Sequence, residues 1–132
     1  MAKRKLVFVV DDDAAHLRAV ERLLKARGFD SKTFHSAEDF FDRADTSDGI
    51  CLVLDIHLSG MSGIELSRQL EISGVFLPII FITADDRDVT RKTALEVGCV
   101  AYLHKPFPAK LLMDAIEKAS AQRRDDGGSI SP

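Results

Sequence analysis

At 132 residues, the chain is long enough for a single domain with its own hydrophobic core. Hydrophobic residues make up 45% of it and charged residues 30%, as in ordinary globular proteins. The formal net charge of −3 gives no electrostatic signature for nucleic-acid binding, and no segment approaches the ~20 apolar residues that cross a bilayer.

The chain begins with a short apolar run, residues 6–10 (LVFVV), which predicts a buried strand. Basic residues precede this run, but it is too short for a signal peptide and meets the acidic residues 11–13 at once. An amphipathic helix follows, for which Gly28 is a stop signal. Its apolar face holds Leu17, Val20 and Leu24. Residues 31–34 (SKTF) predict a weaker second strand.

The middle of the chain repeats this alternation. A second helix is expected after the capping pair Ser36 and Asp39. Its apolar positions, at i, i+3, i+4 and i+7, are Ala37, Phe40, Phe41 and Ala44. Residues 50–54 (ICLVL) predict a strand buried on both faces, which runs into the single carboxylate Asp55. A third helix ends near Gly74, and its apolar residues include Ile64 and Leu70.

Two further strands are predicted at residues 78–82 (PIIFI) and 100–104 (VAYLH). The helix between them, at about 87–97, has the weakest apolar stripe, formed by Val89, Ala94 and Val97. Pro108 can start the last helix. The apolar stripe of that helix is Leu111, Leu112, Ala115, Ile116 and Ala119. We therefore expect one domain over residues 4–120, with 121–132 as a disordered tail or the start of a linker.

Strands that alternate with helices predict βαβ units and a mainly parallel sheet. Five such units in about 120 residues favour an α/β, flavodoxin-like, doubly wound fold with strand order 2-1-3-4-5 and helices on both faces of the sheet. Ligands of this architecture bind beyond the carboxyl ends of the strands, where the strand order reverses. Polar side chains stand at each of the ends concerned, namely Asp11, Asp12, Asp55, Thr83 and Lys105.

The chemistry of these residue types indicates phosphoryl transfer. Crowded carboxylates repel one another, and a hard cation with oxygen ligands relieves the repulsion. Mg²⁺ suits such a site best, because it accepts a few carboxylates and can also hold a phosphate. A metal ion, the ammonium of Lys105 and the hydroxyl of Thr83 could together stabilise a transferring phosphoryl group. Asp55 could then be the nucleophile that forms an aspartyl-phosphate.

Four motifs carry these residues: VVDDD (9–13), LDIHLSGMSGIEL (54–66), FITA (81–84) and YLHKPF (102–107). Together, and at this spacing, they resemble the receiver domain of bacterial two-component response regulators. The resemblance implies a phosphorylation-dependent signalling switch of a phosphorelay, not an enzyme. Its phosphoryl donor would be a histidine kinase or a histidine phosphotransfer protein, and its cofactor Mg²⁺.

The resemblance also implies a role for each site residue. Asp55 corresponds to the phosphoacceptor and Lys105 to the lysine that pairs with it, through a cis Lys105–Pro106 bond. Asp12 corresponds to the direct Mg²⁺ ligand, with Asp11 acting through water. The backbone carbonyl of His57 would complete the metal ligands.

The family's switch residues correspond to Thr83, which closes onto the phosphoryl group, and Tyr102, which then turns inward. Its signalling face corresponds to the fourth helix, the fifth strand and the fifth helix, through which homodimers can also form. His57 and Asp85 occupy variable positions that adjust the lifetime of the phosphoryl group in this family. Ser59 replaces the usual proline, which leaves its loop less rigid, and Ser62 can still cap the third helix.

Two other functions remain open. One is a phosphorylation-independent interaction module on the same fold. The other is a phosphatase of the haloacid-dehalogenase type, for which Asp11 and Asp13 would form an Asp-x-Asp pair. The second alternative leaves Asp55 unexplained and lacks a following acidic motif.

Three histidines, His16, His35 and His104, show no ligand spacing and are interpreted as structural. Cys51 and Cys99 are expected to be free thiols in a cytoplasmic protein, because they lack disulfide-framework or metal spacing. We expect no membrane association and no direct binding of nucleic acid by this segment. Whether the chain acts alone or is cut from a longer regulator is left open.

Overall fold

The computed structural model describes residues 4–128. Its five strands form one sheet. All strand pairs are parallel and the order is β2-β1-β3-β4-β5, which confirms the predicted fold class and strand order. The strands are β1 (Leu6–Val10), β2 (Asp30–Phe34), β3 (Gly49–Asp55), β4 (Ile79–Thr83) and β5 (Ala101–His104). The helices are α1 (Ala14–Ala26), α2 (Ala37–Arg43), α3 (Gly63–Ile72), α4 (Asp88–Val97) and α5 (Ala109–Gly128), with a 3₁₀ turn at Thr46–Asp48.

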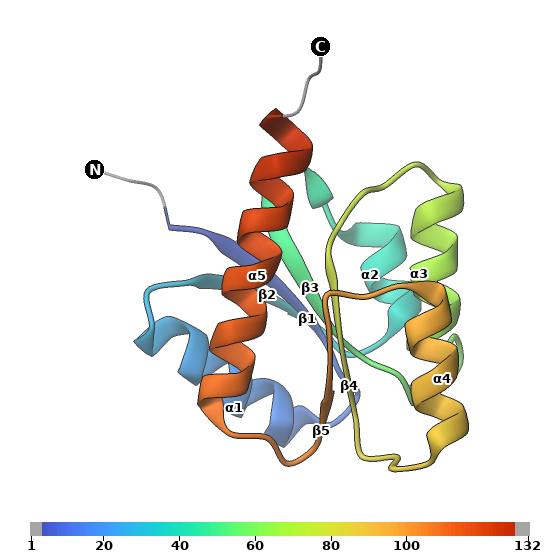
Figure 1. The fold of residues 1–132 in the computed structure, drawn as a ribbon. Coiled ribbons are helices and arrows are strands. Elements are labelled where there is room, and N and C mark those ends of the chain that lie inside the picture. Colours follow the sequence, from blue (N-terminus) through green and yellow to red (C-terminus); the bar gives the residue numbers. More distant parts are fainter. Residues whose placement is uncertain (1–3, 129–132) are drawn as a thin grey trace.

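The helices cover the sheet in two layers, α1 and α5 on one face and α2, α3 and α4 on the other (Figure 1). Successive residues of a strand point to opposite faces, so each central strand supplies both layers. In β3, Cys51 and Val53 pack with α1 and α5, whereas Leu52 and Leu54 pack with the other three helices. This explains why the central strands are continuously apolar in sequence.

The register of the sheet aligns the carboxyl ends of its strands. Val10 of β1 lies opposite Leu54 of β3, and Asp55 lies opposite Ile82 of β4. Lys105 continues β5 by donating its backbone N–H to the carbonyl of Thr83 at 2.7 Å. The polar residues that follow the strands therefore meet at one edge of the sheet.

Three residues of the predicted apolar stripes are exposed instead of buried. The exposed fractions are 39% for Phe41, 63% for Val89 and 47% for Leu111. Each lies at the margin of its helix stripe, where the sheet no longer covers the side chain. In α4 the buried positions are Thr90 and Ala94, so this helix contacts the sheet through small side chains.

The last helix extends further than expected, since α5 continues to Gly128 where a tail was predicted from residue 121. Good helix formers such as Ala121 and Gln122 carry the helix past the end of its apolar stripe. Ser120 is also buried, and it accepts a hydrogen bond from Lys5 Nζ at 2.9 Å. The part of the predicted tail at 129–132 lies outside the described residues, and the domain limit of 120 stays a prediction.

Both cysteines are free thiols, as predicted. Burial raises the pKa of Cys51 to about 12, so this thiol is unreactive. Among residues 4–128, none of the helices combines the length and hydropathy that a bilayer crossing requires.

Candidate functional site

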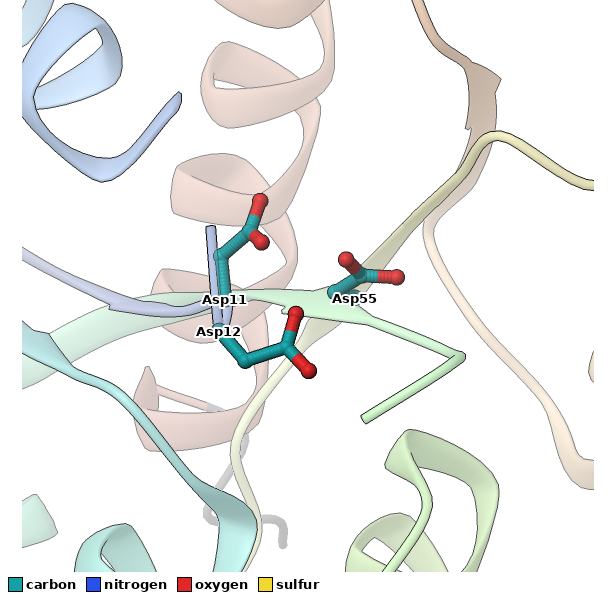
Figure 2. Close-up of side chains that lie close together, drawn as sticks. All are labelled: Asp11, Asp12 and Asp55. Carbon is teal, nitrogen blue, oxygen red and sulfur yellow. The ribbon is translucent and has the colours of Figure 1, made fainter. Parts of the chain in front are cut away.

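Three carboxylates gather at the carboxyl edge of the sheet, where the strand order reverses. Asp11 and Asp12 follow β1, and Asp55 is the last residue of β3. Figure 2 shows the three side chains together, and one carboxylate oxygen of each lies within 4.8 Å of the others. Asp11 and Asp55 are buried, whereas Asp12 is exposed at the mouth of the site. The predicted acidic cluster is thus present.

Lys105 places its ammonium between the two buried carboxylates. Its Nζ donates to Asp11 Oδ2 and to Asp55 Oδ2, each at 2.9 Å. The residue enters the site from the loop after β5, where the Lys105–Pro106 bond is cis, as the resemblance implied. Only 17% of the lysine side chain is exposed, so water screens these contacts weakly.

The pKa shifts in this trio follow from burial and from its hydrogen bonds. Burial raises the pKa of Asp55, and the nearby charge of Asp11 adds to this effect, while Lys105 opposes it. Burial disfavours ionised Asp11 as well, but hydrogen bonds from His16, Lys105 and the Asp13 amide outweigh it and hold the pKa of Asp11 well below its usual range. Burial also disfavours the ammonium of Lys105, yet its bonds to the two carboxylates raise its pKa.

Replacing Lys105 by methionine is expected to lower the free energy of unfolding by about 3 kcal/mol at neutral pH in EDTA, because two buried carboxylates lose the cation they share. Chemical denaturation measures this loss. The matched control is Lys110→Met, which removes an exposed i,i+4 pair with Asp114 and should leave the free energy of unfolding nearly unchanged. Adding Asp55→Asn to the Lys105 variant should restore part of the loss. Equal stability of Lys105→Met and the wild type would contradict this electrostatic account.

The donor set fits a hard divalent cation. The three groups that converge are carboxylates, and oxygen ligands of this kind are the ones that Mg²⁺ prefers. His57 lies two residues after Asp55, and its backbone N–H donates to Asp55 Oδ1 at 3.1 Å. The role of the His57 carbonyl as a further metal ligand stays a prediction.

The predicted switch residues, Thr83 and Tyr102, both contact Asp85. Thr83 is fully buried at the end of β4, and its Oγ1 accepts the backbone N–H of Asp85 at 3.0 Å. The hydroxyl of Tyr102, a partly buried residue, lies 3.5 Å from the Asp85 carbonyl oxygen. Within residues 4–128, the Thr83 hydroxyl makes no hydrogen bond to Asp55 or to Lys105, although the backbone N–H of Lys105 donates to the Thr83 carbonyl oxygen.

Asp85 is also the centre of a hydrogen-bonded network on the β4–α4 loop. Its carboxylate accepts from Arg87, from Thr90 Oγ1 at 2.7 Å and from His57 Nε2 at 2.8 Å. The hydrogen bonds from Arg87, followed by those from Thr90 and His57, hold the pKa of Asp85 well below its usual range. The network ties the loop after β3, through His57, to the first turns of α4.

The β3–α3 loop is held at its middle by two hydrogen bonds, although Ser59 was expected to leave it less rigid. The backbone N–H of Ser59 donates to Asp12 Oδ2 at 3.3 Å, a bond that proline could not make. The N–H of Met61 donates to Glu38 Oε2 at 2.9 Å, and Gly60 between them has a φ of 80°. Ser62 caps α3 as predicted, by accepting from the Glu65 amide.

Glycine is required at residue 63 because of a close approach. A Cβ atom there would collide with the backbone carbonyl oxygen of Asp55 and lie 3.0 Å from the Cα of Ile56. The start of α3 therefore packs directly against the chain that carries Asp55. Any larger residue would have to displace that segment.

Two site residues were not identified from the sequence, His16 and Glu38. His16, interpreted as structural, places its Nδ1 2.6 Å from Asp11 Oδ2. Its position in the first turn of the helix that follows the acidic residues is a signal that could have indicated this contact. No comparable signal exists for Glu38, which lies 23 residues from Met61 in the sequence.

Comparisons with known proteins show the family to which the chain is similar. The family model described as the response regulator receiver domain matches residues 7–117. Transcriptional regulatory protein TdiR of Thauera aromatica is 36% identical over 119 residues, covering 90% of this chain and 52% of that protein. Response regulator protein TodT of Pseudomonas putida is 32% identical over 132 residues, covering 98% of this chain and 58% of that protein. The chain thus spans little more than half the length of these curated relatives.

Solved structures give the same result. The structure of response regulator StyR has a TM-score of 0.83 and 40% identity, covering 95% of this chain and 65% of that one. The crystal structure of FixJ-N has a TM-score of 0.83 and 33% identity, covering 91% of this chain and 96% of that one. The similarity to FixJ-N therefore extends over nearly the whole of both chains.

Proposed function

Because the chain belongs to the response regulator receiver domain family, we propose that it is a phosphorylation-dependent switch whose phosphoacceptor is Asp55. The observation that carries the proposal is the environment of Asp55. Its buried carboxylate ends the third strand, within hydrogen-bond distance of Lys105 and close to two further acidic residues. An isolated turn or capping aspartate would not require such surroundings.

The phosphoryl donor is proposed to be a histidine kinase or a histidine phosphotransfer protein. An oxygen of Asp55 attacks the phosphorus atom, the phosphorus–nitrogen bond of the donor phosphohistidine breaks, and the imidazole leaves. Lys105, already 2.9 Å from Asp55 Oδ2, stabilises the negative charge of the transferred group. Asp11, Asp12 and Asp55 would hold Mg²⁺, which supplies neutralisation of charge on the phosphoryl oxygens.

The signal is proposed to leave the site through Thr83 and Tyr102. Movement of Thr83 toward the phosphorylated Asp55 would alter its contact with Asp85, to which Tyr102 is also joined. The α4–β5–α5 face would then change. The exposed Val89 and the small buried contacts of α4 support this choice, because few apolar contacts hold that helix in place. Homodimerisation through the same face is part of the proposal.

The curated relatives are longer than this chain, which covers 52% of TdiR and 58% of TodT. TdiR is named a transcriptional regulatory protein, and we propose a role for this chain in the same kind of regulation. A cytoplasmic location follows from that role. Binding to nucleic acid is not assigned to the described segment.

Phosphoryl capture by the purified chain tests the proposal. Incubation with acetyl phosphate and Mg²⁺ is expected to add one phosphoryl group per chain, read by intact mass. Hydroxylamine should remove it, because acyl phosphates react with this nucleophile and phosphate esters of serine or threonine do not. A chain that stays unlabelled, or a label that resists hydroxylamine, would rule out the aspartyl-phosphate.

The phosphorylation-independent module is distinguished by a stable phosphoryl mimic. Beryllofluoride with Mg²⁺ is expected to shift the amide resonances of Thr83, Tyr102 and α4 in NMR spectra of the wild-type chain. Unchanged spectra at saturating mimic would favour the module.

A further inference from the structure

His16 makes a contact with the acidic site that the proposed phosphoryl transfer does not use. Its Nδ1 lies 2.6 Å from Asp11 Oδ2, and 24% of its side chain is exposed. Its ring meets that of Phe107 edge to face, with centroids 5.9 Å apart and planes at 89°. The imidazole is thus fixed between the end of β1 and the loop that carries Lys105.

The hydrogen bonds of Asp11 show which atom donates. Asp11 Oδ2 accepts from Lys105 Nζ at 2.9 Å, and Oδ1 accepts from the Asp13 amide at 2.9 Å. A carboxylate oxygen that already accepts from an ammonium acts as an acceptor, so the short contact requires hydrogen on Nδ1 of His16. Three separate donors therefore orient one fully buried carboxylate.

The ring of His16 is not needed to cap α1. The helix is capped by Asp13, whose Oδ1 accepts the backbone amides of Ala15 and His16 at 3.0 and 3.2 Å. Phe107, which the imidazole contacts, packs against the buried apolar cluster between the sheet and α1 and α5. The contact with Asp11 is therefore separable from the capping of the helix.

We infer that His16 is a positioning residue for the metal site: its Nδ1–H holds the Asp11 carboxylate in the orientation that faces Asp12 and Asp55, and so strengthens Mg²⁺ binding. The inference rests on the proposed function, because it takes the acidic cluster as the Mg²⁺ site. Groups that hydrogen-bond to the carboxylate ligands of a metal commonly change affinity by 10- to 100-fold when removed. Without the His16 imidazole, Asp11 Oδ2 would keep one hydrogen-bond donor, Lys105 Nζ.

The test compares two substitutions of equal shape. Asparagine carries an amide N–H at the position of histidine Nδ1, and leucine carries a methyl group there. His16→Leu is expected to weaken Mg²⁺ binding about tenfold, whereas His16→Asn should stay within about threefold of the wild type. Isothermal titration calorimetry of Mg²⁺ into the unphosphorylated full chain measures both. His16→Ala, which also lacks a donor and favours helix, serves as a second loss variant.

Two controls separate the possible failures. His35→Leu alters an exposed histidine after β2 and should leave Mg²⁺ affinity unchanged. Asp12→Asn should remove Mg²⁺ binding. If the wild type binds Mg²⁺ and Asp12→Asn does not, but His16→Leu and His16→Asn bind equally, the role of His16 is refuted and the proposed function stands. If the wild type itself binds no Mg²⁺, both fail.

Discussion

Asp55→Asn is expected to abolish labelling by acetyl phosphate, because the amide that replaces the carboxylate cannot form the acyl phosphate. The loss should be complete, because the two neighbouring carboxylates of the cluster are placed differently from Asp55. Asp11 is held by Lys105, His16 and the Asp13 amide, and Asp12 is exposed at the mouth of the site. Intact mass after incubation with the phosphodonor and Mg²⁺ measures the effect.

The asparagine variant should remain folded, which makes the loss interpretable. Burial raises the pKa of Asp55, which means that the ionised carboxylate carries a desolvation penalty inside the folded chain. A neutral amide avoids this penalty and can still accept a hydrogen bond from Lys105. Asp42→Asn on the exposed side of α2 is the control and should label as fully as the wild type. Equal labelling of Asp55→Asn would show that the phosphoacceptor is another residue.

Withdrawing Mg²⁺ is expected to reduce the rate of labelling by about a hundredfold or more, since metal, ammonium and fixed dipoles supply most of the catalysis of phosphoryl transfer. Asp12→Asn should give a similar reduction with Mg²⁺ present. Asp12 is the exposed member of the cluster, and among the described residues its Oδ2 accepts only the long bond from the Ser59 amide. Its carboxylate is therefore the one most available to a metal ion.

The neighbouring residue provides the control for this charge change. Asp13→Asn removes the same charge one position away, and asparagine caps a helix as well as aspartate does. Asp13 caps α1 through its Oδ1, so the fold should be retained. Labelling of Asp13→Asn should follow the wild type. Mg²⁺-independent labelling, or equal losses in both variants, would contradict a metal site built on Asp12.

The sequence predicted the positions of the strand ends because a buried parallel strand consists of an uninterrupted run of apolar residues. Once β1, β3 and β4 were placed, their carboxyl ends determined where Asp11, Asp55 and Thr83 would lie. No strand boundary differs from its predicted position by more than one residue. Asp55, which was expected to follow β3, is the last residue of that strand. The catalytic and metal roles of these residues remain predictions that the experiments above address.

Other features of the structure could not be predicted from the periodicity of apolar residues. The bond from Glu38 to the Met61 amide joins segments that are distant in sequence, and so does the bond from His57 to Asp85. The extension of α5 beyond residue 120 depends on helix propensity in a stretch without apolar periodicity. The spacing of His16 excludes it as a direct metal ligand, but its contact is with the Asp11 carboxylate, and ligand spacing does not predict contacts of this kind.

The contact between Thr83 Oγ1 and the Asp85 amide has a thermodynamic consequence for partner proteins. If phosphorylation draws the threonine side chain away, any protein that binds α4 only while this contact is intact must oppose phosphorylation. Linkage makes the two effects reciprocal, so the factor by which phosphorylation weakens that protein's binding equals the factor by which its binding disfavours the phosphorylated state. The steady-state phosphorylation of this chain would then report the concentration of its downstream target as well as the activity of its kinase.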